Sequence, residues 1–183
     1  LAGRGQIVGV TAEAGMGKSR LVAEFEKVAQ QREVVVAFGE CQAYGVNTAY
    51  FVWRPVWSSL FGLDDGLPEH ERVRKLETEL QTIDAALVPR APLLGGLLDL
   101  PIPDNGLTAS LDAKLRKTSL EGLLAECLRA RAASQPIAIV LEDCHWIDPL
   151  SRELLVVLGR AVADLDVLLL LAYRPSAHAD AEL

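Results

Sequence analysis

A glycine-rich stretch that ends in lysine and serine carries the clearest chemistry in this sequence. Gly15, Gly17, Lys18 and Ser19 follow the apolar run 7–10, and apolar residues at helical spacing come next. A glycine-rich turn between a strand and a helix directs backbone N–H groups at phosphate oxygens, and a helix N-terminus favours anions. The lysine can reach the β- and γ-phosphates, and the serine hydroxyl can bind Mg²⁺. The pattern predicts a binding site for a nucleoside triphosphate with Mg²⁺.

The phosphate-binding signature G-x-x-x-x-G-K-[ST] is incomplete in this chain. In the register that ends at Ser19, Ala12 occupies the position of the first glycine. That glycine mainly eases the exit from the strand, so alanine fits the turn if its backbone φ angle stays negative. We expect the nucleotide-binding segment to consist of Ala12, Glu13, Ala14, Gly15, Met16, Gly17, Lys18, Ser19 and Arg20.

A pair of carboxylates, Glu142 and Asp143, follows the buried-looking apolar run 137–141. Ligands of parallel sheets bind at the carboxyl ends of the strands, so this pair is placed for catalysis. One carboxylate would hold Mg²⁺ and the other would orient or deprotonate the water that attacks the γ-phosphate. The spacing alone does not assign the two roles, and taken alone the pair also fits the polar exit of a strand.

Arg174 follows the apolar run 167–173 and precedes Pro175. If that run is a neighbouring strand, the arginine ends beside the carboxylates and can sense the γ-phosphate. The alternative is an ordinary surface arginine before a proline. Trp146 lies close to the acidic pair in sequence, and we expect it to be a packing residue.

The three cysteines, Cys41, Cys127 and Cys144, are odd in number, widely spaced and without a C-x-x-C pair. This pattern favours neither a disulfide framework nor a zinc site, and it predicts reduced, buried thiols. A metal-binding or catalytic pair of Cys144 with His145 is disfavoured, because neighbouring side chains at a strand end point in opposite directions.

The fold class follows from four apolar segments that are expected to form strands, at 6–12, 34–39, 137–141 and 167–173. Most are continuous apolar runs rather than alternating ones, which is typical of a parallel sheet covered on both faces. Helices are predicted at 18–31 and 149–163, the second with Asp148 as its N-cap and Pro149 at its first position. The sequence therefore predicts a three-layer α/β/α fold.

A long helical insert is expected between the second and third strands. Apolar residues recur at helical spacing over 73–87 and again over 111–128. The Pro- and Gly-rich patch 89–106 between them is interpreted as a short connection with one broken apolar turn at 93–100. We expect no domain boundary there, so 1–183 form a single domain.

Composition and charge restrict the partners. The formal net charge is −7, which disfavours direct contact with nucleic acid, because lysine and arginine supply most of that affinity. No apolar run reaches the roughly 18 residues that a membrane span needs, and the first residues lack the pattern of a signal peptide. We therefore expect a cytoplasmic protein without a membrane partner. Because the sequence begins with leucine, we expect it to be an excerpt of a longer protein.

Together these motifs resemble the AAA-type ATPase module of the STAND class of signalling P-loop NTPases. Similar modules follow bacterial class III adenylate/guanylate cyclase domains and occur in large LuxR-type transcriptional regulators. The segments that carry the resemblance are Ala12–Leu21 (AEAGMGKSRL), Leu141–Ser151 (LEDCHWIDPLS), Leu169–Pro175 (LLLAYRP), Tyr44-Gly45, Thr48, Tyr50 and Trp53-Arg54-Pro55. Ala12 departs from the usual glycine, and Ala49 stands where these modules often have proline.

The resemblance implies a nucleotide-dependent switch that cycles slowly between ATP and ADP forms with Mg²⁺. It places Glu142 on the metal with Ser19, Asp143 on the attacking water and Arg174 at the γ-phosphate. Its partners would be repeat and output domains of the same parent protein. By this resemblance, chain 1–183 would be an NTPase core without the upstream adenine-contact segment and without the downstream fifth strand, lid and winged helix. The first strand would then be an exposed edge that can self-associate.

Two other functions remain open at this point. A non-hydrolysing scaffold could keep the fold and a bound nucleotide without turnover, because Ala12 alters the signature. A small-molecule kinase with a P-loop core would transfer phosphate to an acceptor. The context Leu141-Glu142-Asp143-Cys144 is unlike an acceptor site and disfavours the kinase.

Overall fold

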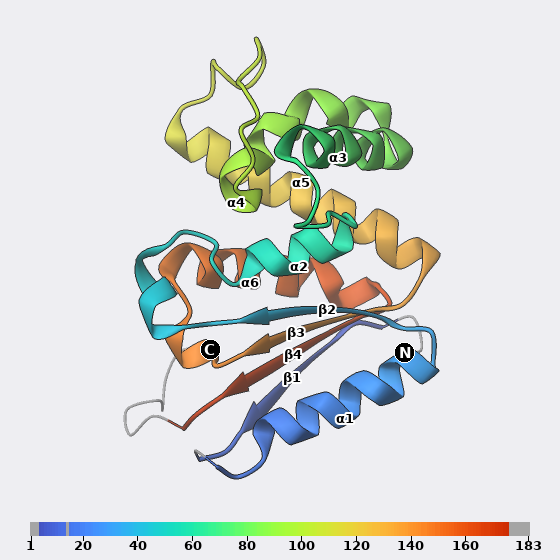
Figure 1. The fold of residues 1–183 in the computed structure, drawn as a ribbon, viewed down its shortest axis with the longest axis vertical. Coiled ribbons are helices and arrows are strands. Elements are labelled where there is room, and N and C mark those ends of the chain that lie inside the picture. Colours follow the sequence, from blue (N-terminus) through green and yellow to red (C-terminus); the bar gives the residue numbers. More distant parts are fainter. Residues whose placement is uncertain (1–3, 14, 176–183) are drawn as a thin grey trace.

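The computed structural model describes residues 4–13 and 15–175, which form a three-layer α/β/α domain (Figure 1). Its four strands make one parallel sheet in the order β1-β4-β3-β2. The strands are β1 (Gln6–Thr11), β2 (Val35–Glu40), β3 (Ile137–Glu142) and β4 (Val167–Tyr173). The predicted fold class is confirmed, and each strand lies within one residue of its predicted bounds.

Strand β3 lies between β2 and β4 and is buried on both faces. Ile137, Ile139 and Leu141 belong to the large hydrophobic core, whereas Val140 packs with Val22 in a smaller cluster. This alternation arises because successive side chains of a strand point to opposite faces. It explains why the run is continuously apolar: each face of the sheet has its own helical layer to pack against.

Helix α1 (Lys18–Gln31) covers one face of the sheet (Figure 1). It has the predicted bounds, but it buries only Val22 and Ala29 completely. On this face Val8 of the first strand is still 39% exposed, and Val10 is only partly buried against the small cluster.

The opposite face is covered by α2 (Trp53–Leu60), α5 (Ala113–Ser134) and α6 (Pro149–Ala161). Asp148 caps α6 as predicted, because its carboxylate accepts a hydrogen bond from the Ser151 N–H at 2.9 Å. Helix α6 ends at Ala161, two residues before the predicted end, and a 3₁₀ turn, Val162–Asp164, follows.

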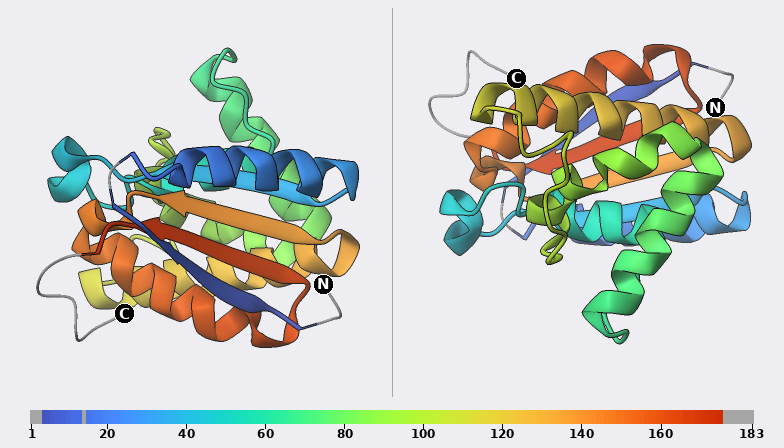
Figure 2. Two further views of the ribbon diagram at one scale, coloured as in Figure 1. Left: turned by 90° about the horizontal axis from the view of Figure 1, so that it is seen from below. Right: turned by 90° about the horizontal axis from the view of Figure 1, so that it is seen from above.

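The insert between β2 and β3 contains α3 (Glu69–Ile83), which extends away from the sheet (Figure 2). The interpretation of 89–106 as a short connection with one broken turn was partly wrong. A 3₁₀ segment (Ala85–Leu94) and α4 (Gly95–Leu98) fill much of it, and Leu94, Leu97 and Leu98 are fully buried. Pro89 and Pro92 lie within this 3₁₀ segment, and 3₁₀ turns are frequent as connectors.

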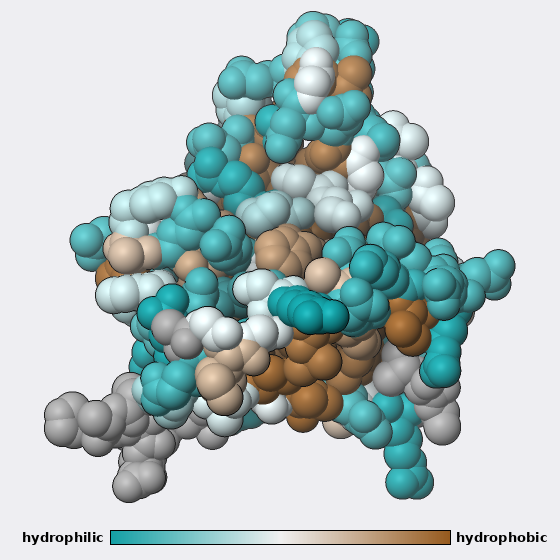
Figure 3. Space-filling model, turned by 60° about the horizontal axis from the view of Figure 1, so that its bottom comes forward, coloured by the Kyte–Doolittle hydropathy of each residue, from teal (hydrophilic) through white to brown (hydrophobic). Residues whose placement is uncertain are grey.

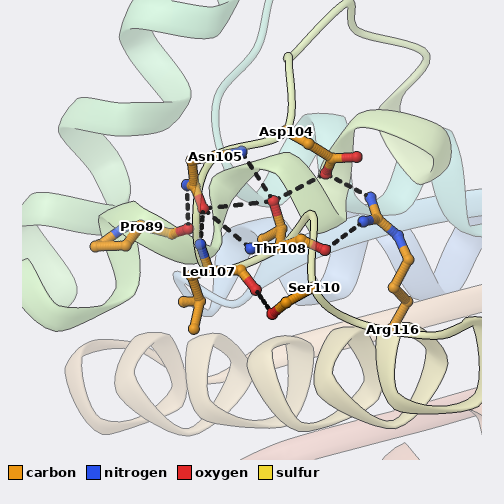
Figure 4. Close-up of polar contacts among 7 residues, drawn as sticks. All are labelled: Pro89, Asp104, Asn105, Leu107, Thr108, Ser110 and Arg116. Carbon is orange, nitrogen blue, oxygen red and sulfur yellow. Dashed lines mark hydrogen bonds and ion pairs between the residues drawn. The ribbon is translucent and has the colours of Figure 1, made fainter.

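The turn before α5 is held by a network of polar side chains (Figure 4). The Asn105 amide donates to the Pro89 carbonyl at 2.7 Å, and the buried Thr108 hydroxyl donates to Asp104 at 2.8 Å. Arg116 reaches back from α5 to Asp104 and to the Thr108 carbonyl, both at 2.8 Å. This network connects the 3₁₀ segment, the turn and α5 into one unit.

Strand β1 forms one edge of the sheet, and its side chains are poorly covered. Ile7 is 53% exposed and Val8 is 39% exposed. A groove of about 710 Å³ runs between β1 and α6, lined by Ile7, Leu155, Val156, Leu171 and Tyr173. Hydrophobic side chains are visible on this side of the molecule in Figure 3. Among the described residues, no helix has the length and hydrophobicity that crossing a membrane requires.

The β1 edge predicts self-association, because an exposed apolar edge pairs readily with another chain. We expect Ile7→Lys to weaken this association by placing a charge on the edge. The control is Val28→Lys, which adds the same charge at a 46% exposed position on α1. Sedimentation velocity over a concentration series measures the effect. Equal association of the two variants would contradict a β1 interface.

Candidate functional site

The loop between β1 and α1 has the backbone conformation that a phosphate-binding turn requires. Gly15 and Gly17 adopt positive φ angles of 79° and 87°. A Cβ atom at either position would meet no other atom within 4 Å, so the backbone conformation, rather than space, favours glycine there. Ala12 is not among the residues with positive φ, so alanine is accommodated at the exit of β1.

Lys18 begins α1 and bends back over the loop. Its ammonium group donates hydrogen bonds to the Ala12 carbonyl and, at 3.3 Å, to the Glu13 carbonyl. The cation is thereby held at the centre of the turn, between the end of β1 and the first turn of α1. A phosphate bound by this turn would meet the ammonium group and the helix N-terminus together.

Ser19 connects the glycine-rich loop to the carboxyl end of β3. Its hydroxyl donates to Oε2 of Glu142 at 3.1 Å. Glu142 shares the face of β3 that carries Val140, which packs with Val22 of α1. The alternation of the strand therefore directs Glu142 toward α1, where Ser19 stands in the first turn.

Asp143 leaves the strand in the left-handed conformation, with φ 50° and ψ 40°. Aspartate tolerates this region better than most residues. The turn brings its Oδ1 to 3.8 Å from Nδ1 of His145. Burial lowers the pKa of His145, and the nearby Asp143 carboxylate opposes this shift, while Arg174 and Lys18 reinforce it.

Arg174 follows the last residue of β4 and lies at the same edge of the sheet. It lines a cavity of about 290 Å³ together with Lys18, Ser19, Arg20 and Asp143. Glu13, Gly15 and Gly17 complete the lining. The lining therefore carries three cations and one hydroxyl against two carboxylates, Glu13 and Asp143, and this positive excess suits an anionic ligand with several oxygens.

Comparison with known proteins agrees with this geometry. The AAA ATPase domain family matches residues 1–171. The chain belongs to this family. An uncharacterized protein of Rhizobium meliloti (strain 1021) is 30% identical over 181 residues, covering 96% of this chain and 17% of that protein. The chain thus spans less than a fifth of the length of this relative. Membership of this family supports nucleotide binding at the site described above.

The ATPase domain brings together most of the residues predicted from the sequence. Glu13, Gly15, Gly17, Lys18, Ser19, Arg20, Asp143 and Arg174 line the cavity. Ala12 and Glu142 stand behind it, in contact with Lys18 and Ser19 respectively. Met16 is 73% exposed at the tip of the loop and does not line the cavity. Ala14 lies outside the described residues.

Glu40 is a carboxylate of the ATPase domain that the sequence analysis missed. It ends β2 and pairs in register with Glu142 on β3. Its charge raises the pKa of Glu142, although less than desolvation does. The sequence pattern that could have identified Glu40 is its position directly after the apolar run 34–39, just as Glu142 comes directly after the apolar run 137–141.

Trp146, predicted to be a packing residue, packs against one neighbouring ring but does not belong to the core. Trp146 is 44% exposed and lies in a short 3₁₀ helix, Cys144–Trp146, beside the ring of His145. The three cysteines are free and buried, as predicted. The reason given against a pair of Cys144 with His145 does not hold, because both lie in this helix rather than on a strand.

The carboxylates of the ATPase domain suit Mg²⁺ held with a nucleotide. Among the described residues, no group of three or more histidine, cysteine or acidic side chains could hold a metal ion alone. Mg²⁺ is usually bound through one or two carboxylates plus substrate phosphates and water. The Ser19 hydroxyl and the Glu142 carboxylate converge at 3.1 Å and fit that role.

Desolvation is the main cause of the raised pKa of Glu142, and the charges of Asp143 and Glu40 add to it. The hydrogen bond from Ser19 and the charge of Lys18 act in the opposite direction. Without a cation at this position, the charged form of Glu142 therefore destabilises the fold. A bound cation would favour the charged form.

This imbalance predicts a pH-dependent effect of Glu142→Gln on the nucleotide-free domain. A carboxyl whose folded pKa is raised loses stability as pH rises from its ordinary pKa through the folded value. We therefore expect Glu142→Gln to raise the free energy of unfolding at neutral pH but not below the ordinary carboxyl range. Urea denaturation at both pH values measures this difference.

The matched control is Glu77→Gln, which neutralises an exposed glutamate on α3 and reproduces the change in net charge. If the two variants change the free energy of unfolding equally at neutral pH, the charged form of Glu142 does not destabilise the fold.

Proposed function

We propose that this domain binds ATP with Mg²⁺, hydrolyses it slowly and acts as a nucleotide-dependent switch within a larger signalling protein. The observation that carries the proposal is the hydrogen bond between Ser19 and Glu142. It joins the glycine-rich loop to the acidic strand end, the two parts that NTP hydrolysis needs in one place.

Each site residue has a role that corresponds to its position in the site. The loop N–H groups and Lys18 bind the phosphates, while Ser19 and Glu142 hold Mg²⁺, which supplies charge neutralisation on the phosphate oxygens. Asp143, directed into the cavity edge by its left-handed turn, accepts a hydrogen bond from the attacking water. Arg174 stabilises the negative charge that develops on the γ-phosphoryl oxygens.

The switch role rests on the resemblance to STAND modules and on the size of the relative. The Rhizobium meliloti protein is several times longer than this chain, since the matched region covers 17% of it. A domain embedded in a long chain has neighbours to which a nucleotide state can be transmitted. A cyclase or DNA-binding output would belong to such neighbours.

Lys18→Ala tests nucleotide binding. The substitution removes one charge-assisted contact, which contributes about 1.5–3 kcal/mol, so affinity for Mg-ATP should fall roughly 10- to 100-fold. Lys27→Ala is the control, because Lys27 is an exposed lysine of α1 that pairs with Glu24 at 2.9 Å and does not line the nucleotide cavity. Calorimetric titration measures both affinities, and circular dichroism checks the fold. Equal affinities would remove the phosphate-binding assignment.

Asp143→Asn and Glu142→Gln separate hydrolysis from binding. Asn keeps the shape of Asp143 but is a poor acceptor for a proton, so phosphate release should drop while Mg-ATP affinity survives. Gln is a weaker Mg²⁺ ligand than Glu, so Glu142→Gln should weaken the Mg²⁺-dependent part of ATP binding.

Single-turnover phosphate release and ATP titration with and without Mg²⁺ distinguish the outcomes. If the two variants show the reverse pattern, the roles of the carboxylates are exchanged. If the parent chain binds ATP and neither variant changes a measurable turnover, the non-hydrolysing scaffold is the correct function.

A further inference from the structure

A second cavity, of about 550 Å³, lies between the helical insert and the sheet. Its walls are the end of α2, the second half of α3 and the end of α5. Val35 and Ile137, the first residues of β2 and β3, form its floor. It therefore opens at the amino ends of these strands, whereas the nucleotide site lies at their carboxyl ends.

The charged residues of this cavity leave an excess of positive charge. Arg131 forms an ion pair with Glu79 at 2.5 Å, so the one acidic side chain in the lining is already neutralised. Lys75 also lines the cavity, and within the described part of the chain no ion pair or hydrogen bond is recorded for it. The Nε atom of Arg131 is buried without a hydrogen-bond partner.

Hydroxyl and apolar groups complete the surface. Ser59, Thr82 and Ser134 line the cavity from three different helices. Half-buried Val35, Ile83 and Ala130 lie between them over the fully buried Phe61 and Leu60. A volume of this size with an apolar wall and a few polar groups is typical of small-molecule sites.

We propose that this cavity binds a small organic anion whose apolar body rests on Val35, Ile83 and Ala130 and whose carboxylate, sulfonate or phosphate group meets Lys75. The choice of an anion follows from the unpaired ammonium group and from the guanidinium Nε that lacks an acceptor. A metal ion does not fit, because the only carboxylate in the lining is bound to Arg131. The site is independent of the proposed ATPase activity.

The probe for the test is anilinonaphthalene sulfonate, an anion with an aromatic body whose fluorescence rises in apolar surroundings. Titrations are made on the full chain with saturating Mg-ADP, so that the nucleotide site is not available to the probe. We expect saturable binding that Lys75→Gln weakens about tenfold, because a charge-assisted contact is lost. Lys114→Gln, which neutralises an exposed lysine at the start of α5, should bind the probe as the parent does.

A second pair of variants tests occupancy of the cavity without changing charge. Thr82→Trp places a large side chain in the lining and should abolish probe binding. Thr78→Trp is matched to it, because Thr78 is one turn earlier on α3, is also exposed and makes the same hydroxyl bond to a carbonyl four residues back. Thr78→Trp should leave binding unchanged.

Three results would overturn the proposal. The first is equal probe affinity in Lys75→Gln and Lys114→Gln. The second is full binding by a folded Thr82→Trp variant. The third is loss of the signal in Ile7→Thr, which would place the probe in the groove beside β1 instead. Circular dichroism of each variant establishes that the fold is retained.

Discussion

The burial of β3 on both faces is the constraint on which the rest of the structure depends. Because both faces are covered, every residue of the strand must be apolar until it reaches the edge of the sheet. The first polar residue is Glu142. Because residues two apart on a strand share a face, Glu142 points to the same side as Val140, which is the side of α1. The hydrogen bond from Ser19 follows from that direction and from the start of α1 beside the glycine-rich loop.

The elements with local signals could be predicted well from the sequence. Helix α1 has its predicted bounds because the glycine-rich turn before it and its own apolar spacing define both ends. The start of α6 was predicted because Asp148 and Pro149 are capping residues whose effect needs no tertiary contact. The strands of the sheet were found because they are continuously apolar.

The features that depend on tertiary structure could not be predicted in this way. Glu40 acts on Glu142 only because of the register between β2 and β3, and a single sequence does not contain that register. The exposure of Trp146 could not be predicted, because it depends on how the chain turns after Asp143. The 3₁₀ segment 85–94 was missed because its prolines signal a break, while its leucines are held in place by α3 and α5.

The left-handed backbone at Asp143 restricts how the sequence of this domain can drift. Most side chains are strained at φ 50°, whereas glycine, asparagine and aspartate adopt this region readily. A descendant that no longer needs a carboxylate here is therefore expected to carry asparagine or glycine rather than alanine or a branched residue. If Asp143 has the role in hydrolysis that we propose, the residue at this position in a relative would indicate whether that role is retained.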